Sequence, residues 1–247
     1  MASKRAKYTL LKSFKIFHYR KYHSNNFRNF GISRLIISTY QSITGTGIKA
    51  VNQLENENKN IKGEMAYHYP ILKNAIPHCD DFLENGYTKE EMKLVNETHK
   101  ILDPNIEVVA HCVRVPVFIG HAEAVFIETT KQIDEGEARE SLNNFPGVVV
   151  VDHRESGGYV TQQECAGEDA VYVSRLRKDP TVKNGLVFWC VSDNLRKGAA
   201  LNAVQIAETK LIKGPSTWDG EKKQWRHWSS KLEGYIAGIS PDLLRLM

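Results

Sequence analysis

The chain has 247 residues, of which 41% are hydrophobic and 25% are charged. This length allows one large domain or two small ones, and the composition excludes a wholly disordered chain or a fibrous repeat. The longest apolar run, residues 186–191, is far shorter than the roughly 18 residues of a membrane span, so we expect no membrane partner. The four cysteines lie far apart without a CxxC pair, which favours a reducing, cytoplasmic compartment over a zinc or disulfide scaffold.

Charge is distributed unevenly along the chain. The net charge is +4, but residues 1–54 contain ten Lys and Arg residues and no acid, so the remainder is net acidic. A basic, acid-poor start is typical of an organelle-targeting peptide, which stays an alternative to a cytoplasmic location. Contact with nucleic acid is the weaker interpretation, because no recognised binding motif accompanies the charge.

The composition divides the chain into three zones. Residues 1–30 form a basic arm without helical or strand periodicity, which we expect to be disordered or unrelated to the rest. Residues 31–210 are predicted to form one α+β domain with a mixed or antiparallel sheet flanked by helices. Residues 211–247 form a tryptophan-rich tail, in which Trp225 and Trp228 begin a helical stripe.

The elements of the middle zone follow one another closely. A strand at 35–38 runs into a polar turn at 41–47, after which we expect a helix. Thr88 and Glu91 form a capping box that opens a helix to about Ile101, and a second helix is expected at 135–143. Alternation and flanking turn residues predict further strands at 107–117, 122–130, 148–152, 170–176 and 186–192, and the last helix at 195–210.

Four short segments carry groups suited to chemistry. Arg114 and His121 flank a turn; an arginine binds a carboxylate with two hydrogen bonds, and a histidine exchanges a proton near neutral pH. Glu90 and Lys93 are neighbours at a helix start. The turn at 38–47 can present backbone N–H groups to phosphate, and the segment 192–200 places two cations at a helix start. Each pattern alone is more typical of an ordinary turn or a solvated helix end than of a functional site.

Together these segments resemble the C-terminal part of aspartate-semialdehyde dehydrogenase. The similarity covers about residues 30–210, and the motifs keep the order of that family. They are Ser38-Thr-Tyr-Gln41, Asn85-Gly-Tyr-Thr-Lys-Glu-Glu-Met-Lys93, Cys112-Val-Arg-Val-Pro-Val117 with Gly120-His121, Pro146–Asp152, and Asp193-Asn-Leu-Arg-Lys-Gly-Ala-Ala-Leu-Asn-Ala-Val-Gln205.

The resemblance implies NADPH-dependent reduction of L-aspartyl-4-phosphate to aspartate semialdehyde, a step toward lysine, methionine and threonine. It implies His121 as general acid/base and Gln41 as the residue that orients the substrate. Substrate binding is implied for three further residues, Arg114 at the carboxylate, Glu90 at the amine and Lys93 at the phosphate. Contacts with NADP near the nicotinamide are implied for Thr44, Gly45 and Asn194. No metal is implied.

Two features of the family have no counterpart in the sequence. We find neither a glycine-rich NADP loop of a Rossmann domain nor a cysteine at the position of the family's nucleophile, so we expect an incomplete enzyme that is inactive alone. A second interpretation is a dimerisation module that forms a homodimer or pairs with a full-length subunit. A third is an enzyme with a recruited cysteine or a separately encoded N-terminal partner.

Overall fold

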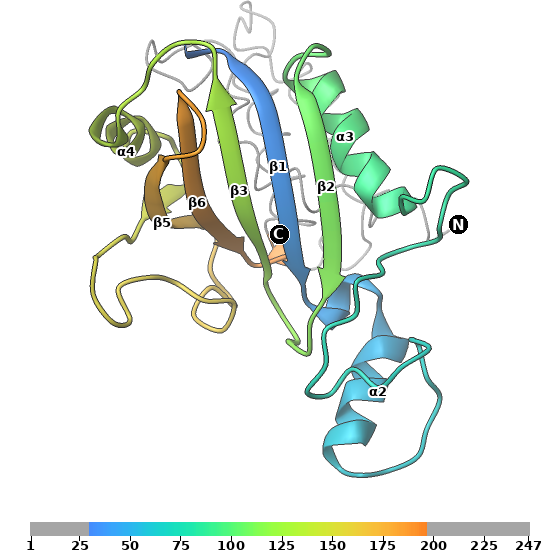
Figure 1. Ribbon diagram of the computed structural model, residues 1–247. Helices are drawn as coiled ribbons and strands as arrows, with labels where there is room; N and C mark the ends of the chain where they lie inside the picture. Colours follow the sequence, from blue (N-terminus) through green and yellow to red (C-terminus); the bar gives the residue numbers. More distant parts are fainter. Residues whose placement is uncertain (1–29, 197–247) are drawn as a thin grey trace, which may run out of the picture. The chain divides into compact units, whose positions relative to one another are not determined.

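The computed structural model describes residues 30–196, which form a six-stranded sheet with helices (Figure 1). The expectations for the basic arm, the helix at 195–210 and the tryptophan-rich tail lie outside these residues, apart from the first two positions of that helix. The elements in chain order are β1 (Ile32–Gln41), the 3₁₀ turn η4 (Ile43–Gly45), α2 (Ile48–Asn58), α3 (Lys89–Ile101), β2 (Glu107–Arg114), β3 (His121–Thr129), α4 (Glu135–Asn143), β4 (Val148–Val150), β5 (Val171–Asp179) and β6 (Gly185–Ser192).

The sheet is mixed, with the strand order β2-β1-β3-β6-β5-β4. β1 runs parallel to β2 and β4 parallel to β5, whereas the β1–β3, β3–β6 and β5–β6 pairs are antiparallel. This arrangement confirms the predicted α+β class.

β1 is much longer than the predicted strand at 35–38, and it includes Gln41, which we had assigned to the turn. Its side chains alternate between buried and partly exposed positions along its length. The partly exposed positions include Ser38 and Tyr40, so the sequence shows little apolar continuity there. Pairing on both sides, with β2 and with β3, extends the strand to Gln41.

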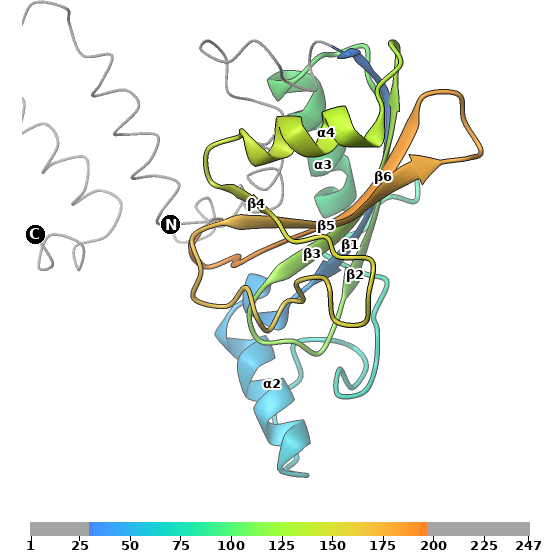
Figure 2. The ribbon, with the colours of Figure 1, turned by 90° about the vertical axis from the view of Figure 1, so that its left-hand side faces the viewer.

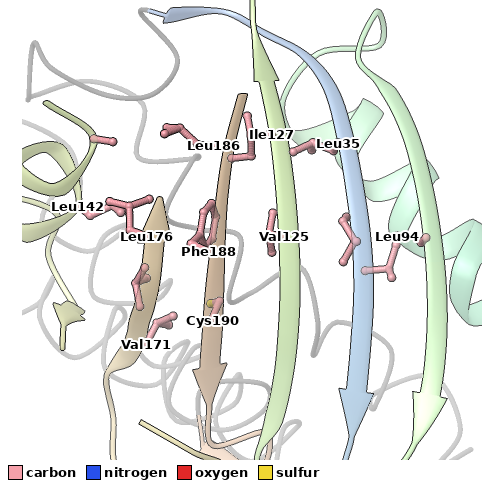
Figure 3. Packing of buried hydrophobic residues seen from close by; sticks show 14 of the residues in the cluster. Leu35, Leu94, Val125, Ile127, Leu142, Val171, Leu176, Leu186, Phe188 and Cys190 are labelled. Atoms are coloured by element: carbon pink, nitrogen blue, oxygen red, sulfur yellow. The ribbon is translucent and has the colours of Figure 1, made fainter. Parts of the chain in front are cut away.

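One face of the sheet carries the main hydrophobic core. Side chains from β1, β2, β3, β5 and β6 meet Leu94 of α3 and Leu142 of α4 in a single cluster. Figure 2 shows α3 and α4 on the same side of the sheet, and Figure 3 shows the row of core side chains from Leu35 to Val171. The two helices therefore bury this face, as the apolar alternation of the strands requires.

The capping boxes explain where α3 and α4 begin. Thr88 accepts a hydrogen bond from the backbone of Glu91, and the Glu91 carboxylate accepts one from the backbone of Thr88. Asp134 and Glu137 repeat this arrangement at the start of α4. The predicted helices at 88–101 and 135–143 are thereby observed almost at their predicted limits.

β5 departs from its predicted limits because it contains a bulge. The strand continues to Asp179, and its register with β6 shifts between Ser174 and Arg177. Arg175 has a positive φ of 58°, and Asp152 accepts hydrogen bonds from the backbone of Arg175 and Leu176. A bulge interrupts the alternation of inward and outward side chains that marks a strand. The alternation therefore predicts a strand only to residue 176.

The opposite face of the sheet is covered only in part. A smaller cluster there joins Ala122 and Val191 to Val160 and Cys165 of the segment 153–169. Tyr40 and Trp189 lie against this cluster, with ring centroids 5.5 Å apart.

Within residues 30–196, we find no helix that is long and apolar enough to cross a membrane.

Candidate active site

Three predicted site residues lie in one row across three neighbouring strands. Gln41, the last residue of β1, is paired with Arg114, the last residue of β2, and with His121, the first residue of β3. Paired residues of adjacent strands project from the same face of a sheet. We call Arg114, Gln41 and His121 the active-site row. It lies at the end of the sheet from which η4 and α2 continue (Figure 1).

Gly45 lies between the two ends of this row. A Cβ atom at Gly45 would lie 2.8 Å from Arg114 Nη1 and 3.1 Å from His121 Nε2. These two nitrogens are therefore within about 6 Å of each other. Only a residue without a side chain fits between them, so the structure gives Gly45 a steric role beside its predicted contact with NADP.

The guanidinium of Arg114 is buried and anchored on one side. Its Nη1 donates a hydrogen bond of 2.6 Å to the carbonyl of Ser42, while its Nε has no partner. The backbone of Arg114 is also fixed, since its N–H and C=O both bond to Ile76. The Cys79 thiol also interacts with this guanidinium, so the unpaired Nε is the donor left for an anion.

His121 is a buried histidine that holds no charge near neutral pH. Its burial, together with the charges of Arg114 and Lys93, lowers its pKa to about 3. Nδ1 accepts a hydrogen bond from the backbone N–H of Ser42 at 3.2 Å, and the Ser42 hydroxyl lies 3.1 Å from the same atom. Because a backbone N–H can only donate, the neutral ring carries its proton on Nε2, the nitrogen that faces Gly45 and Arg114.

Asn194 forms hydrogen bonds that join three turns beside His121. Its Oδ1 accepts hydrogen bonds from Ser42 Oγ at 3.0 Å and from the backbone of Gly120 at 2.8 Å, while its Nδ2 donates to Thr44 Oγ1 at 3.0 Å. Thr44 in turn donates to the carbonyl of Phe118. Asn194 and Thr44, which we predicted as cofactor contacts, thus hold the turns that carry Gly45 and His121.

α3 brings the remaining two predicted residues toward the row. The Lys93 ammonium lies 3.3 Å from both carboxylate oxygens of Glu90, and both side chains are mostly buried. Lys93 is also close enough to His121 to lower its pKa. Glu91, the next residue of the helix, has other partners: it closes the helix cap and accepts a hydrogen bond from the backbone of Cys112.

Three polar residues of the site were not assigned a role from the sequence. Ser42 contacts His121, and Gln162 donates hydrogen bonds to the carbonyls of Tyr40 and Gly120. Glu123 is almost fully buried on the same face as His121, two residues further along β3. Strand alternation could have revealed Glu123, because it is the one acidic residue of the inward-facing set of β3, which also holds His121, Val125, Ile127 and Thr129.

All four cysteines of the chain are buried and free. Burial raises the pKa of Cys79 to about 11 and that of Cys165 to about 12, and it raises those of Cys112 and Cys190 as well. The thiolate is the nucleophilic form of cysteine. At neutral pH these thiols therefore stay protonated, which is unfavourable for attack on an acyl phosphate.

Comparison with known proteins matches this arrangement to one family. Residues 27–197 match the family model described as semialdehyde dehydrogenase, dimerisation domain. The chain belongs to the aspartate-semialdehyde dehydrogenase family. The family resemblance expected from the motifs is thereby confirmed.

Relatives within the family extend beyond the matched region. The Aquifex aeolicus aspartate-semialdehyde dehydrogenase is 48% identical over 191 residues, which are 74% of this chain and 56% of that protein. The chain therefore spans just over half the length of this relative. The crystal structure of Vibrio cholerae aspartate semialdehyde dehydrogenase II complexed with ASA is 38% identical, with a TM-score of 0.73, over 85% of this chain and 61% of that one.

The fold itself is shared more widely. The structure of the Candida albicans aspartate semialdehyde dehydrogenase with NADP is 22% identical, with a TM-score of 0.54, over 73% of this chain and 51% of that one. The mixed sheet with its flanking helices is thus the fold of the family's dimerisation domain.

Proposed function

We propose that this chain carries the substrate-binding and acid–base part of an aspartate-semialdehyde dehydrogenase, which acts on L-aspartyl-4-phosphate in the biosynthesis of lysine, methionine and threonine. The observation that carries this proposal is the active-site row. Arg114, Gln41 and His121 occupy paired positions on three strands, so a cation, an amide and an imidazole face one small region. A cytoplasmic location belongs to the same proposal.

Each residue has a role that its surroundings favour. The free edge of Arg114 binds the α-carboxylate of the substrate, because one guanidinium nitrogen is already held by Ser42. Gln41 orients the substrate between Arg114 and His121. The Nε2 proton of His121 donates a hydrogen bond to the reacting oxygen. For Nε2 to accept a proton, the ring would have to carry its own proton on Nδ1 instead. The hydrogen bond from the backbone N–H of Ser42 would then break.

Glu90 and Lys93 bind opposite charges of the same substrate. Their 3.3 Å contact keeps both groups oriented before the substrate arrives. The Glu90 carboxylate then turns to the substrate ammonium, and the Lys93 ammonium turns to the phosphate. Binding thus exchanges one ion pair for two.

The residues near the row fit the nicotinamide end of NADP. Thr44, Gly45 and Asn194 would line that end, because Asn194 bonds to Thr44 and Ser42, and the backbone N–H of Gly45 bonds to the carbonyl of Ser42, in one polar turn next to His121. When bound, NADPH supplies the hydride. The Candida albicans structure that contains NADP has the same fold.

A chimaera tests the proposal directly. Residues 27–197 of this chain would replace the corresponding segment of the Aquifex aeolicus relative, and NADP reduction by aspartate semialdehyde and phosphate would be followed by absorbance. We expect turnover that Arg114→Leu and His121→Asn each lower by at least about a hundredfold. The unmodified Aquifex enzyme is the control. A folded chimaera without turnover would refute the proposal.

A second candidate function is pairing through the sheet face opposite α3 and α4. A groove of about 270 Å³ on that face is lined by Ala124, Phe126, Tyr159, Val187 and Trp189, among others. Its lining is mostly apolar, and apolar surface of this kind marks interaction sites. We infer that a second copy of the chain or a full-length subunit binds there.

A further inference from the structure

Buried polar atoms without hydrogen-bond partners are concentrated around the active-site row. Among residues 30–196 they include Thr39 Oγ1, Gln41 Nε2, Arg114 Nε and both carboxyl oxygens of Glu123. Only two further atoms of this kind occur in the described part, one in His78 and one on α3. Because folded proteins pair nearly all buried polar groups, this concentration indicates a hydrogen-bonding arrangement that involves an additional molecule.

The strand register places these groups on two consecutive rows of one face. Glu123 of β3 is paired with Thr39 of β1 and with Cys190 of β6. Gln41 is two residues beyond Thr39, on the same face, and is therefore a diagonal neighbour of Glu123. Diagonal neighbours have Cα atoms roughly 7–8 Å apart, which lies within reach of two long side chains.

Within residues 30–196, no cation compensates a charge on Glu123. Thr39 and Cys112 lie on one side of it, Cys190 on the other, and His121 on its own strand. Arg114 directs Nη1 to Ser42, and the acids of α3 bond to Lys93, Thr88 and Cys112. Burial therefore raises the pKa of Glu123 to about 8, and the carboxyl keeps its proton at neutral pH.

We propose that Glu123 is a positioning residue, whose carboxyl acts with Thr39 to hold the side-chain amide of Gln41 in a fixed orientation beside Arg114 and His121. The inference rests on the proposed function, in which Gln41 orients the substrate. The three side chains are joined through one ordered water, which accepts from Gln41 Nε2 and from the Glu123 hydroxyl and donates to Thr39 Oγ1. Buried waters typically make about three such bonds to otherwise unpaired groups.

The first experiment measures the protonation of Glu123 in the 247-residue chain. Glutamate labelled with ¹³C at the carboxyl is followed by NMR against pH, and the Glu123 signal is assigned by its loss in Glu123→Gln. We expect a midpoint above pH 7, whereas an ordinary glutamate titrates near about 4.3. A midpoint below pH 6 would overturn the proposal.

The second experiment follows the side-chain amide signals of Gln41, assigned by their loss in Gln41→Glu. Glu123→Gln, which keeps a neutral hydrogen-bonding group, should leave their positions and solvent exchange close to those of the wild type. Glu123→Leu should shift them and speed exchange by at least about tenfold. Glu128→Gln, on the same strand, is the matched control. Unchanged Gln41 signals in a folded Glu123→Leu chain would refute the link.

These measurements are independent of turnover. If Glu123→Leu does not fold, two measurements remain: the wild-type titration of Glu123 and the Gln41 amide signals in Glu123→Gln. A shift of those amide signals in Glu123→Gln would contradict the proposal. A chimaera without activity, together with a high Glu123 midpoint, would refute the proposed function while leaving the protonated carboxyl in place.

Discussion

Arg114 and His121 pack closely in this site, and single residues between them fix their positions. Gly45 separates Arg114 from His121, and Ser42 holds both of them through its carbonyl and its N–H. The burial that this packing requires also determines the protonation of His121 and Glu123, in opposite directions. The turn that follows β1 thus fixes both the guanidinium of Arg114 and the tautomer of His121.

Substitution of Gly45 by alanine tests this packing. The added methyl group would lie 2.8 Å from Arg114 Nη1, so the guanidinium must move away from Ser42. We expect the kcat/KM of the chimaera to fall by at least about tenfold, mainly through KM, because the carboxylate clamp is displaced. Thr46→Ala, one residue further along, is the control and should have a much smaller effect.

The pH dependence of stability tests the neutral state of His121. Its pKa is about 3 in the folded chain and about 6.5 in the unfolded chain, so the unfolded state binds more protons between these values. The contribution of His121 to the free energy of unfolding should therefore rise with pH from 3 to 6.5, with a slope of at most about 1.4 kcal/mol per unit, and then level off. Urea titrations of His121→Asn should lose that contribution. An unchanged slope would contradict the assignment.

Glu123 acts in the opposite sense over a higher range. The folded chain retains the proton of Glu123 up to about pH 8, whereas the unfolded chain loses it near 4.5. The contribution of Glu123 to the free energy of unfolding should therefore fall as pH rises between these values, and it offsets that of His121 where the two ranges overlap. Glu123→Gln should flatten this part of the urea-derived curve, and Glu128→Gln should not.

Among the secondary structure elements, α3 connects the core to the site. Its apolar side contributes Leu94 to the main cluster, while its first turns present Glu90 and Lys93 near the row. Two adjacent glutamates there have different functions. Glu91 joins the helix cap to β2, and Glu90 pairs with Lys93.

A pair of substitutions separates these functions. Glu91→Ala removes the acceptor for two buried backbone N–H groups and should lower the free energy of unfolding by about 2–4 kcal/mol. Glu90→Ala should lower it by less than about 1 kcal/mol, because Glu90 forms only an i,i+3 side-chain pair with Lys93 and accepts no hydrogen bond from a buried backbone N–H. In the chimaera, however, Glu90→Ala should raise KM for aspartate semialdehyde. Equal destabilisation by both variants would contradict this division.

For the molecule as a whole, the two faces of the sheet have different roles. The face under α3 and α4 is a closed core, and the opposite face carries the apolar groove around Phe126 and Trp189. The chain contains no low-pKa thiol, because burial raises the pKa of every cysteine. We therefore expect association rather than catalysis from the purified chain.

Association and catalysis can be measured on the same preparation. Light scattering after size-exclusion chromatography should show a dimer, and Phe126→Arg should shift it to a monomer by placing a charge in the groove. The chain alone should not reduce NADP with aspartate semialdehyde and phosphate. Turnover that disappears in Cys112→Ser would instead identify a recruited nucleophile.

The sequence alone determined the family, the mixed α+β class and most of the elements of residues 30–196. Local signals were sufficient for these features: the two capping boxes fixed α3 and α4, and alternation marked the strands. The predicted site residues also followed from motif order. The spatial arrangement of these residues did not follow from the sequence.

Only the tertiary structure decided which groups meet and in which charge state. The pairing of Gln41 with both Arg114 and His121 depends on the order β2-β1-β3, in which residues far apart in sequence become neighbours. The sequence likewise could not distinguish Glu90 from Glu91, because helix rotation against β2 decides it. The protonation of His121 and Glu123 depends on burial, which arises only when the sheet and its helices close over them.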